Sequence, residues 1–359
     1  MPRIERYLLR EFIRAFLAAA VVLSLVGLGG IAADLLAEIA RGRTPAALLL
    51  SQLGLRIVNY QPILLPLSLF IGLMLAISRL YRDSEMAVLN AVGFGPRQLL
   101  RPVLLLALPV ALLVAVCSLW AVPSAMRTSR AMVETANRSL LVAGLEPGRF
   151  VELPGNEGVL YVTDMDADGT HFQRLFLQRD NGDRLDVITA GSGELFFDGT
   201  EDRYLRLRDG FRVEGALDAL DFRLMRFSRN DIRVPPRSAN DGRRDEALMT
   251  TRNLWATPGA LALAELHWRL GTPLLAMVLA IAAIPLARTS PRSPRYGLLM
   301  LALMAYLLYM NLLILGQAWL GNGQLPPTLG LWWLHAPAAL IAIHLLWRDG
   351  RIGRARALR

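Results

Sequence analysis

Long apolar runs fill the first and last thirds of the chain, and short charged segments separate them. A helix needs about 20 mostly apolar residues to cross a hydrocarbon layer of about 30 Å. Uncharged runs of suitable length cover residues 15–33, 57–78, 102–126 and 270–287. A further uncharged stretch, residues 296–347, is long enough for two helices divided by the turn residues at 321–328. The pattern therefore predicts six membrane-spanning helices.

The hydropathy falls between residues 131 and 264, where turn pairs such as Asn181-Gly182 and Asp209-Gly210 recur at short intervals. Strand-like pieces rich in branched and aromatic residues lie between the turns, at residues 159–163, 175–178, 185–188, 195–197, 204–213 and 221–227. The clearest alternation sets Leu205, Leu207, Phe211 and Val213 against Arg206, Arg208 and Arg212. Such strands favour an antiparallel sandwich, jelly roll or open barrel. We expect an α-helical polytopic membrane protein with an all-β jelly-roll or sandwich domain between its third and fourth helices.

The chain accordingly divides into three parts. Residues 1–130 hold three spans and a cytoplasmic helix at 83–93, residues 131–264 form the β domain, and residues 265–359 hold three more spans and a tail. Arginine in short loops is retained on the cytoplasmic side of a membrane. If both termini are inside, the cytoplasmic pieces hold 16 arginines against five acids. This distribution predicts an inner-membrane protein with cytoplasmic termini and a periplasmic β domain.

Charge and composition exclude several functions. All 39 basic residues are arginine, so the chain lacks the lysine that a phosphate-binding loop or a Schiff-base enzyme requires. The β domain is mildly acidic, which argues against nucleic-acid binding. Cys117 is the only cysteine, and it lies in an apolar run, which predicts an inert residue and no thiolate metal site. The first apolar run is longer than the core of a usual signal peptide, so we expect it to be retained.

An integral-membrane enzyme, such as a lipid-modifying transferase or an intramembrane protease, needs ionisable side chains that converge inside the spans. The candidates are His335 and His344, which point in different directions on one helix, and Asp34 at a span edge. In the β domain His171 is the only histidine, and no nucleophile motif accompanies it. The sequence therefore disfavours an enzyme.

The cytoplasmic segment between the second and third spans is the most informative part of the chain. Asp83 or Ser84 is placed to cap a short helix, Glu85 lies in its first turn, and Gly93 ends it. Met86, Leu89 and Val92, with the neighbouring Val88, predict one apolar stripe. One interpretation is a helix lying on the lipid surface; the other, which the acidic residue favours, is a helix gripped by a nucleotide-hydrolysing partner. The predicted coupling residues are Arg82, Asp83, Ser84, Glu85, Met86, Leu89 and Gly93.

The sequence resembles the LptF/LptG permease family of lipopolysaccharide export over nearly its whole length. The resemblance lies in Arg6-Tyr-Leu-Leu-Arg-Glu11, Leu64-Leu-Pro-Leu-Ser-Leu-Phe70, Leu80-Tyr-Arg-Asp-Ser-Glu85, Ala91-Val-Gly93, Ile284-Pro-Leu286 and Pro291-Arg-Ser-Pro-Arg295. Glu265-Leu-His-Trp-Arg-Leu270 is most similar to the LptF side of the family. A lipoprotein-release permease is the alternative, with four spans and its domain after the first.

The resemblance implies a subunit of a Gram-negative outer-membrane biogenesis system, not an enzyme. It implies a heterodimer with LptG, two copies of the ATPase LptB that use ATP and Mg, and LptC, which hands lipopolysaccharide to LptA. No cofactor or metal is expected on this chain. By the same resemblance, Glu85 is the acid that couples the cytoplasmic helix to the ATPase.

One stretch departs from the family pattern. Basic residues common near the outer end of the first helix are replaced here by Gly29-Gly-Ile-Ala-Ala-Asp34. Arginine forks bind phosphate well, so arginines just outside the membrane are the alternative contacts, although interfacial anchoring explains them equally. Helices one, two and five are expected to line a lipid cavity, with Gly27, Gly29 and Gly30 allowing close packing. The candidate substrate contacts are Asp34, Arg41, Arg43, Arg56, Pro62 and Pro66.

Overall fold

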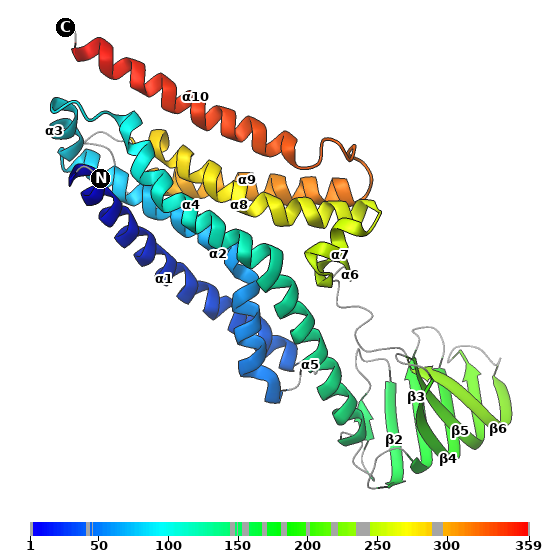
Figure 1. Ribbon diagram of the computed structural model, residues 1–359. Coiled ribbons are helices and arrows are strands. Elements are labelled where there is room, and N and C mark those ends of the chain that lie inside the picture. The colour runs from blue at the N-terminus through cyan, green and yellow to red at the C-terminus, as the bar shows by residue number, and fades with distance from the viewer. Residues whose placement is uncertain are drawn as a thin grey trace. The chain divides into compact units, whose positions relative to one another are not determined.

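Helices and one β-sheet make up the chain in the computed structural model (Figure 1). It describes residues 3–40, 44, 46–143, 148, 150–152, 158–166, 171–180, 185–198, 202–216, 222–234, 245–288 and 297–357. The chain forms two units. One comprises Met1–Asp34, Ser51–Ser129 and Arg244–Arg359, and the other comprises Leu35–Leu50 and Arg130–Arg243.

Both long and short helices occur along the chain. They are α1 (Arg3–Ala40), η1 (Ala46–Leu48), α2 (Leu49–Arg82), α3 (Glu85–Ala91), η2 (Pro96–Leu99), α4 (Leu100–Val116), the π-helical turn η3 (Cys117–Ala121), α5 (Val122–Ala143), α6 (Asp245–Leu248), α7 (Thr251–Ala256), α8 (Ala260–Leu286), α9 (Gly297–Gly321) and α10 (Trp332–Ala357).

Five stretches of described helix are long and apolar enough to cross a membrane: Arg3–Ala40, Ala46–Arg82, Pro96–Val133, Ala260–Leu286 and Met300–Gly321. They match the first five predicted spans. The predicted sixth helix is present as α10, but its uncharged part ends at Trp347, so length and composition alone do not mark it as a span. The prediction of a polytopic helical protein is confirmed.

One apolar cluster joins the helical unit and includes residues of α1, α2, α3, α4, α8, α9 and α10. The helices α1 and α2 pack closely at Gly72, where an added Cβ would lie 2.7 Å from the Cα of Phe16. A side chain there would push the two helices apart, because the clash is with backbone. The sequence also predicts close packing at Gly27, Gly29 and Gly30. A Cβ added at Gly29 or Gly30 would meet nothing within 4 Å, whereas one at Gly27 would lie 3.4 Å from the side chain of Leu64.

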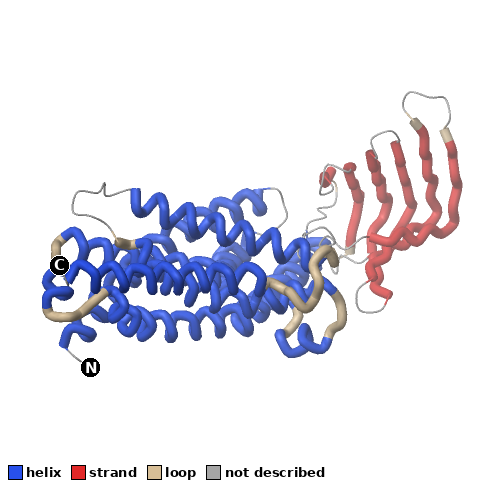
Figure 2. The backbone as a smooth tube through the Cα atoms, turned by 90° about the horizontal axis from the view of Figure 1, so that it is seen from above, coloured by secondary structure: helices blue, strands red, loops and turns tan. Residues whose placement is uncertain are grey.

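The β domain contains one six-stranded antiparallel sheet in the order β1-β2-β3-β4-β5-β6, drawn red in Figure 2. Its strands are β1 (Phe150–Glu152), β2 (Gly158–Met165), β3 (His171–Asp180), β4 (Leu185–Asp198), β5 (Asp202–Gly215) and β6 (Arg223–Val234). An antiparallel β domain is therefore confirmed. The described strands form a meander in a single sheet, and two predicted pieces, residues 185–188 and 195–197, are parts of the one strand β4.

A crease crosses this sheet at one level of every strand from β2 to β6. Each pair of neighbouring strands keeps the same register on both sides of the crease. At the crease itself one residue in each of these strands has no paired partner; these residues are Thr163, Arg174, Gly191, Asp209 and Ser228. Arg174 and Asp209 there have left-handed φ values of 49° and 51°. Side chains consequently change faces at the crease.

The crease corrects two expectations in β5. Asp209-Gly210 was a turn signal in the sequence, yet both residues lie inside the strand. Leu207 is fully buried, whereas Phe211, which strict alternation places on the same face, is 44% exposed. The apolar face of the sheet is built instead from Leu207, Val162, Phe172, Leu175, Leu177, Ile188 and Ala190.

Candidate functional site

The cytoplasmic helix predicted from the sequence is present as α3, and its first residue is Glu85. Glu85 therefore lies in the first turn, as expected, where a carboxylate favours the helix dipole. The predicted side-chain cap is wrong. Ser84 occupies the cap position with a left-handed φ of 60°, and its side chain makes no capping hydrogen bond. The Ser84 carbonyl instead accepts the amide hydrogens of Ala87 and Val88.

The end of α3 depends on Gly93, whose φ of 85° suits a residue without a Cβ. The Phe94 amide donates to the Leu89 carbonyl at 2.8 Å, and the Gly93 amide donates to the Asn90 carbonyl at 3.0 Å. This pair of hydrogen bonds is a Schellman motif, which satisfies carbonyl groups at the helix end. The predicted stop at Gly93 is confirmed.

The apolar residues of α3 point in two directions, not one. Met86 is buried in the helical core, and Leu89 packs against that core. Val88 and Val92 are each 67% exposed and lie one turn apart. The single stripe expected from the sequence is therefore wrong: one pair of residues attaches α3 to its own chain, and the other pair forms an uncovered apolar face.

Polar contacts hold α3 and the end of α2 against the start of α1. The Tyr7 hydroxyl donates to Oε2 of Glu85 at 2.8 Å. Arg79 forms an ion pair with Glu11 at 2.8 Å and approaches Asp83 at 3.9 Å. Glu85 therefore already has a partner on α1 within its own chain. Arg82, the remaining predicted coupling residue, is half-buried at the end of α2.

The structure describes four of the six candidate substrate contacts. Asp34 is exposed near the C-terminal end of α1, and Arg56 is half-buried in α2. Arg41 and Arg43 lie outside the described residues. Pro62 and Pro66 are buried inside α2.

Pro62 and Pro66 flank a contact between the second and fifth predicted spans. The Tyr306 hydroxyl of α9 donates to the carbonyl of Ile63 at 3.0 Å. A proline within a helix removes a backbone donor and loosens the local hydrogen-bond ladder. The Tyr306 contact therefore stabilises a segment of α2 that proline weakens.

Sequence reasoning missed a buried polar centre around Arg269 of α8. Its side chain is 2% exposed and pairs with Glu265 at 2.8 Å. It also donates to the carbonyls of Glu246, Ala247 and Met249 and to the hydroxyl of Thr251. Arg269 and Glu265 lie in the segment Glu265–Leu270, which in the sequence served only as evidence for the family resemblance. The sequence does not reveal the buried centre, because most partners of Arg269 lie about 20 residues earlier in the chain.

The π-helical turn η3 completes this centre. The Ser118 hydroxyl donates to the backbone carbonyl of Arg269 at 3.1 Å, and Thr251 donates to the carbonyl of Leu119. Widened turns of this kind expose carbonyl groups to outside donors. Cys117, the first residue of the turn, is a free, half-buried thiol.

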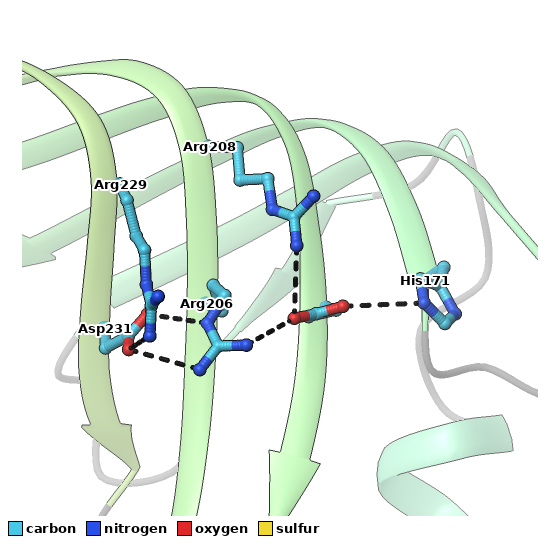
Figure 3. Close-up of polar contacts among 6 residues, drawn as sticks. His171, Arg206, Arg208, Arg229 and Asp231 are labelled. Atoms are coloured by element: carbon cyan, nitrogen blue, oxygen red, sulfur yellow. Dashed lines mark hydrogen bonds and ion pairs between the residues drawn. The ribbon is translucent and has the colours of Figure 1, made fainter.

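A second polar network lies across the β-sheet (Figure 3). Arg206 links Glu194 at 2.8 Å to Asp231 at 3.1 Å, and Arg229 binds Asp231 at 2.6 Å. The hydrogen bonds from Arg229 and Arg206 lower the pKa of Asp231 to about 2. His171 closes the other end of the row, 3.6 Å from Glu194, beside a pocket of about 300 Å³. No group of three potential metal ligands occurs among the residues that the structure describes.

Residues 6–348 match the family described as lipopolysaccharide export system permease LptF/LptG. The chain is 31% identical over 360 residues to the lipopolysaccharide export system permease protein LptF of Escherichia coli strain K12, covering 99% of this chain and 97% of that protein. The protein of that name from Shigella flexneri gives the same identity and coverage. Neither a lipoprotein-release permease nor a membrane enzyme is favoured by these matches. The chain belongs to the LptF/LptG family of lipopolysaccharide export permeases and is most similar to LptF.

Proposed function

We propose that this chain is the LptF-type subunit of an inner-membrane transporter that extracts lipopolysaccharide and passes it to the periplasmic side. The family match over residues 6–348 is the observation that carries this function. By analogy with the family, the chain pairs with LptG, takes its energy from an LptB dimer that hydrolyses ATP, and delivers lipopolysaccharide through LptC to LptA. It binds no cofactor of its own.

In this proposal α3 is the element that meets the ATPase. The exposed apolar face of Val88 and Val92 enters a groove on the ATPase, while Met86 and Leu89 keep α3 attached to the helical core. Glu85 passes the resulting motion to α1 through Tyr7. Three of the predicted coupling residues, Glu85, Met86 and Leu89, therefore act as the anchor of α3. The partner face is formed by Val88 and Val92, which the sequence placed in the apolar stripe but not among the coupling residues.

The lipid path begins at α1 in the same proposal. Its apolar residues Leu17, Val21, Val22, Leu25 and Val26 are between 54% and 70% exposed. A helix that leaves this much apolar surface uncovered by its own chain requires lipid or the second permease subunit as its neighbour. Motion of α1 driven from α3 then opens or narrows a lateral path for lipid. Asp34, Arg41, Arg43 and Arg56 remain the proposed contacts for the lipid headgroup.

The β domain supplies the next surface on the path. One face of its sheet is apolar around Leu207, Phe172 and Ile188, which are at most 4% exposed, and the Asp186–Arg212 ion pair lies beside them on that face. The other face carries the ion-pair row of Arg206, Glu194 and Asp231. An apolar face suits acyl chains, and a charged face suits water. We assign the apolar face to the passage of acyl chains.

The partner face of α3 provides the sharpest test. We expect Val88→Ser/Val92→Ser to weaken copurification of the ATPase about tenfold or more, because two apolar side chains lose their burial at the interface. The second permease subunit should still copurify. The matched control is Leu261→Ser with Trp255→Ser, which alters two exposed apolar residues in α8 and α7.

Three results would contradict the proposal. The first is a wild-type tagged chain that copurifies with neither an ATPase nor a second six-span permease, which would exclude the export function. The second is normal ATPase recovery with the valine variant, and the third is equal loss with the control. Either of these last two would exclude Val88 and Val92 as the partner face and leave the export function standing.

A further inference from the structure

Four arginines form a continuous stripe along the N-terminal part of α1. Arg3, Arg6, Arg10 and Arg14 are all exposed and are spaced by three or four residues. At 3.6 residues per turn this spacing keeps them within an arc of roughly 80° on the helix. Together with Tyr7 and Glu11 they surround a hollow of about 310 Å³. The stripe concentrates four positive charges on one face.

The acidic residues of the same helical segment are engaged elsewhere. Glu5 pairs with Arg101 at 3.4 Å, and Glu11 pairs with Arg79 at 2.8 Å. Both carboxylates are largely buried, with side chains 10% and 14% exposed. Within the part of the chain that the structure describes, no carboxylate pairs with any arginine of the stripe. Its charge is therefore available to an anion from outside the chain.

The helix face that carries the stripe continues directly into exposed apolar residues. Leu17, Val21 and Leu25 follow Arg14 at the same spacing and are 54%, 58% and 63% exposed. One exposed face of α1 thus carries guanidinium groups followed by aliphatic side chains. A ligand complementary to both parts has an anionic head and a hydrocarbon tail. An acidic protein surface would match the arginines but not the apolar continuation.

We propose that this face of α1 binds an anionic phospholipid, with its phosphate held by the arginine stripe and an acyl chain along Leu17, Val21 and Leu25. Arg10 and Arg14 are the principal donors because they lie nearest to the apolar part of the helix. Guanidinium groups bind phosphate through paired hydrogen bonds, and basic clusters beside a membrane span attract anionic lipids. Tyr7, which holds Glu85 of α3, lies next to the stripe, so the lipid adjoins the anchor of α3.

The test uses the full-length chain in nanodiscs that contain phosphatidylcholine and phosphatidylglycerol, and it requires neither ATP nor lipopolysaccharide. Mass spectrometry measures how strongly phosphatidylglycerol is enriched on the protein. We expect Arg10→Gln/Arg14→Gln to lower that enrichment by on the order of fivefold per arginine. Arg97→Gln/Arg348→Gln removes the same charge from exposed residues outside the stripe and should preserve it. Arg6→Gln/Arg14→Gln provides a second stripe variant if the first is not monodisperse.

Competition distinguishes a lipid site from a phosphate site. Short-chain phosphatidylglycerol should displace a labelled long-chain lipid, whereas inorganic phosphate at the same concentration should not. Equal enrichment on the stripe and control variants would overturn the proposal, as would displacement by phosphate alone. A stripe variant that keeps its lipid but loses a copurifying protein would identify a protein-docking surface instead, which also contradicts the proposal. None of these outcomes depends on the export function.

Discussion

Arg269 shows how a single buried charge organises the N-terminal half of α8, the fourth predicted span. A buried ion is costly unless its whole hydrogen-bonding capacity is used, and Arg269 satisfies this requirement through Glu265, three carbonyls and Thr251. The carbonyls belong to α6 and the residue that follows it. Arg269 therefore fixes the segment by which the chain enters α7 and α8.

Replacing Arg269 with Met should destabilise the helical unit strongly. The change leaves Glu265 without its buried partner and three carbonyls without a donor, and losses of this kind cost about 3–5 kcal/mol. The melting temperature of the detergent-solubilised chain measures the effect. Arg252→Met is the control, since Arg252 is exposed in α7. Equal melting temperatures for the two variants would show that the Arg269 contacts contribute little.

The contact between Tyr7 and Glu85 allows the two possible actions of Glu85 to be separated. If Glu85 positions α3 through Tyr7, then Tyr7→Phe should reproduce the defect of Glu85→Ala, because each variant removes one partner of the same hydrogen bond. The hydrogen bond is exposed, so we expect a modest loss, on the order of fivefold, in substrate-stimulated ATP hydrolysis by the assembled complex. Tyr60→Phe, which alters another partly exposed tyrosine, is the control.

A different result would assign Glu85 to the partner. If Tyr7→Phe retained full activity while Glu85→Ala lost it, Glu85 would act directly on the ATPase and not as an anchor. Rescue also separates the two cases. An anchoring role predicts that Glu85→Asp recovers little, because the shorter side chain does not reach the Tyr7 hydroxyl at 2.8 Å.

At the scale of elements, the sheet shows why periodicity predicts strands better than faces. The alternation of Leu205 and Leu207 with Arg206 and Arg208 locates β5 correctly. It does not predict the crease at Asp209. The crease depends on the left-handed backbone of Asp209 and also on unpaired residues in the neighbouring strands β4 and β6, which the sequence of β5 does not contain. Asp and Gly tolerate positive φ, so the same dipeptide serves a turn or a bent strand. Only the pairing partners decide between these outcomes.

The pairing of β5 with β6 should depend on pH through Asp231. The hydrogen bonds from Arg229 and Arg206 lower its folded-state pKa from 3.8 to about 2. A depressed pKa means that the ionised form stabilises the fold above pH of about 4, and that this contribution fades as the pH falls toward 2. Amide-exchange protection of β5 and β6 in the full chain should therefore decrease in that window.

The matched variant for this pH effect is Asp231→Asn. It removes the ionisable group, so its protection should be lower at neutral pH and should change less between pH of about 4 and 2 than that of the wild type. Arg223→Gln, at the exposed start of β6, is the control and should follow the wild-type profile. A wild-type profile in Asp231→Asn would show that another group causes the pH dependence.

At the scale of the whole molecule, the sequence predicts what depends on neighbours along the chain. Uncharged runs locate the spans because crossing a membrane requires local length and apolarity. It does not predict that Gly72 meets the backbone of Phe16, or that Tyr7 reaches Glu85, because each contact joins distant segments. The candidate site is thus predicted as a set of residues, while the separation of the packed residues Met86 and Leu89 from the exposed residues Val88 and Val92 is seen only in the structure.

The single cysteine of the chain allows a direct test of the predicted orientation in the membrane. Cys117→Ala gives a cysteine-free background in which one new thiol reports one position. Arginine retention predicts that the ends of the chain face the cytoplasm and that β6 faces the periplasm. In spheroplasts, a membrane-impermeant maleimide should therefore label Arg226→Cys without lysis and Arg348→Cys only after lysis. Both residues are exposed, so burial does not protect either thiol. The reverse labelling pattern would place α3 on the side without ATP and would exclude coupling through Glu85.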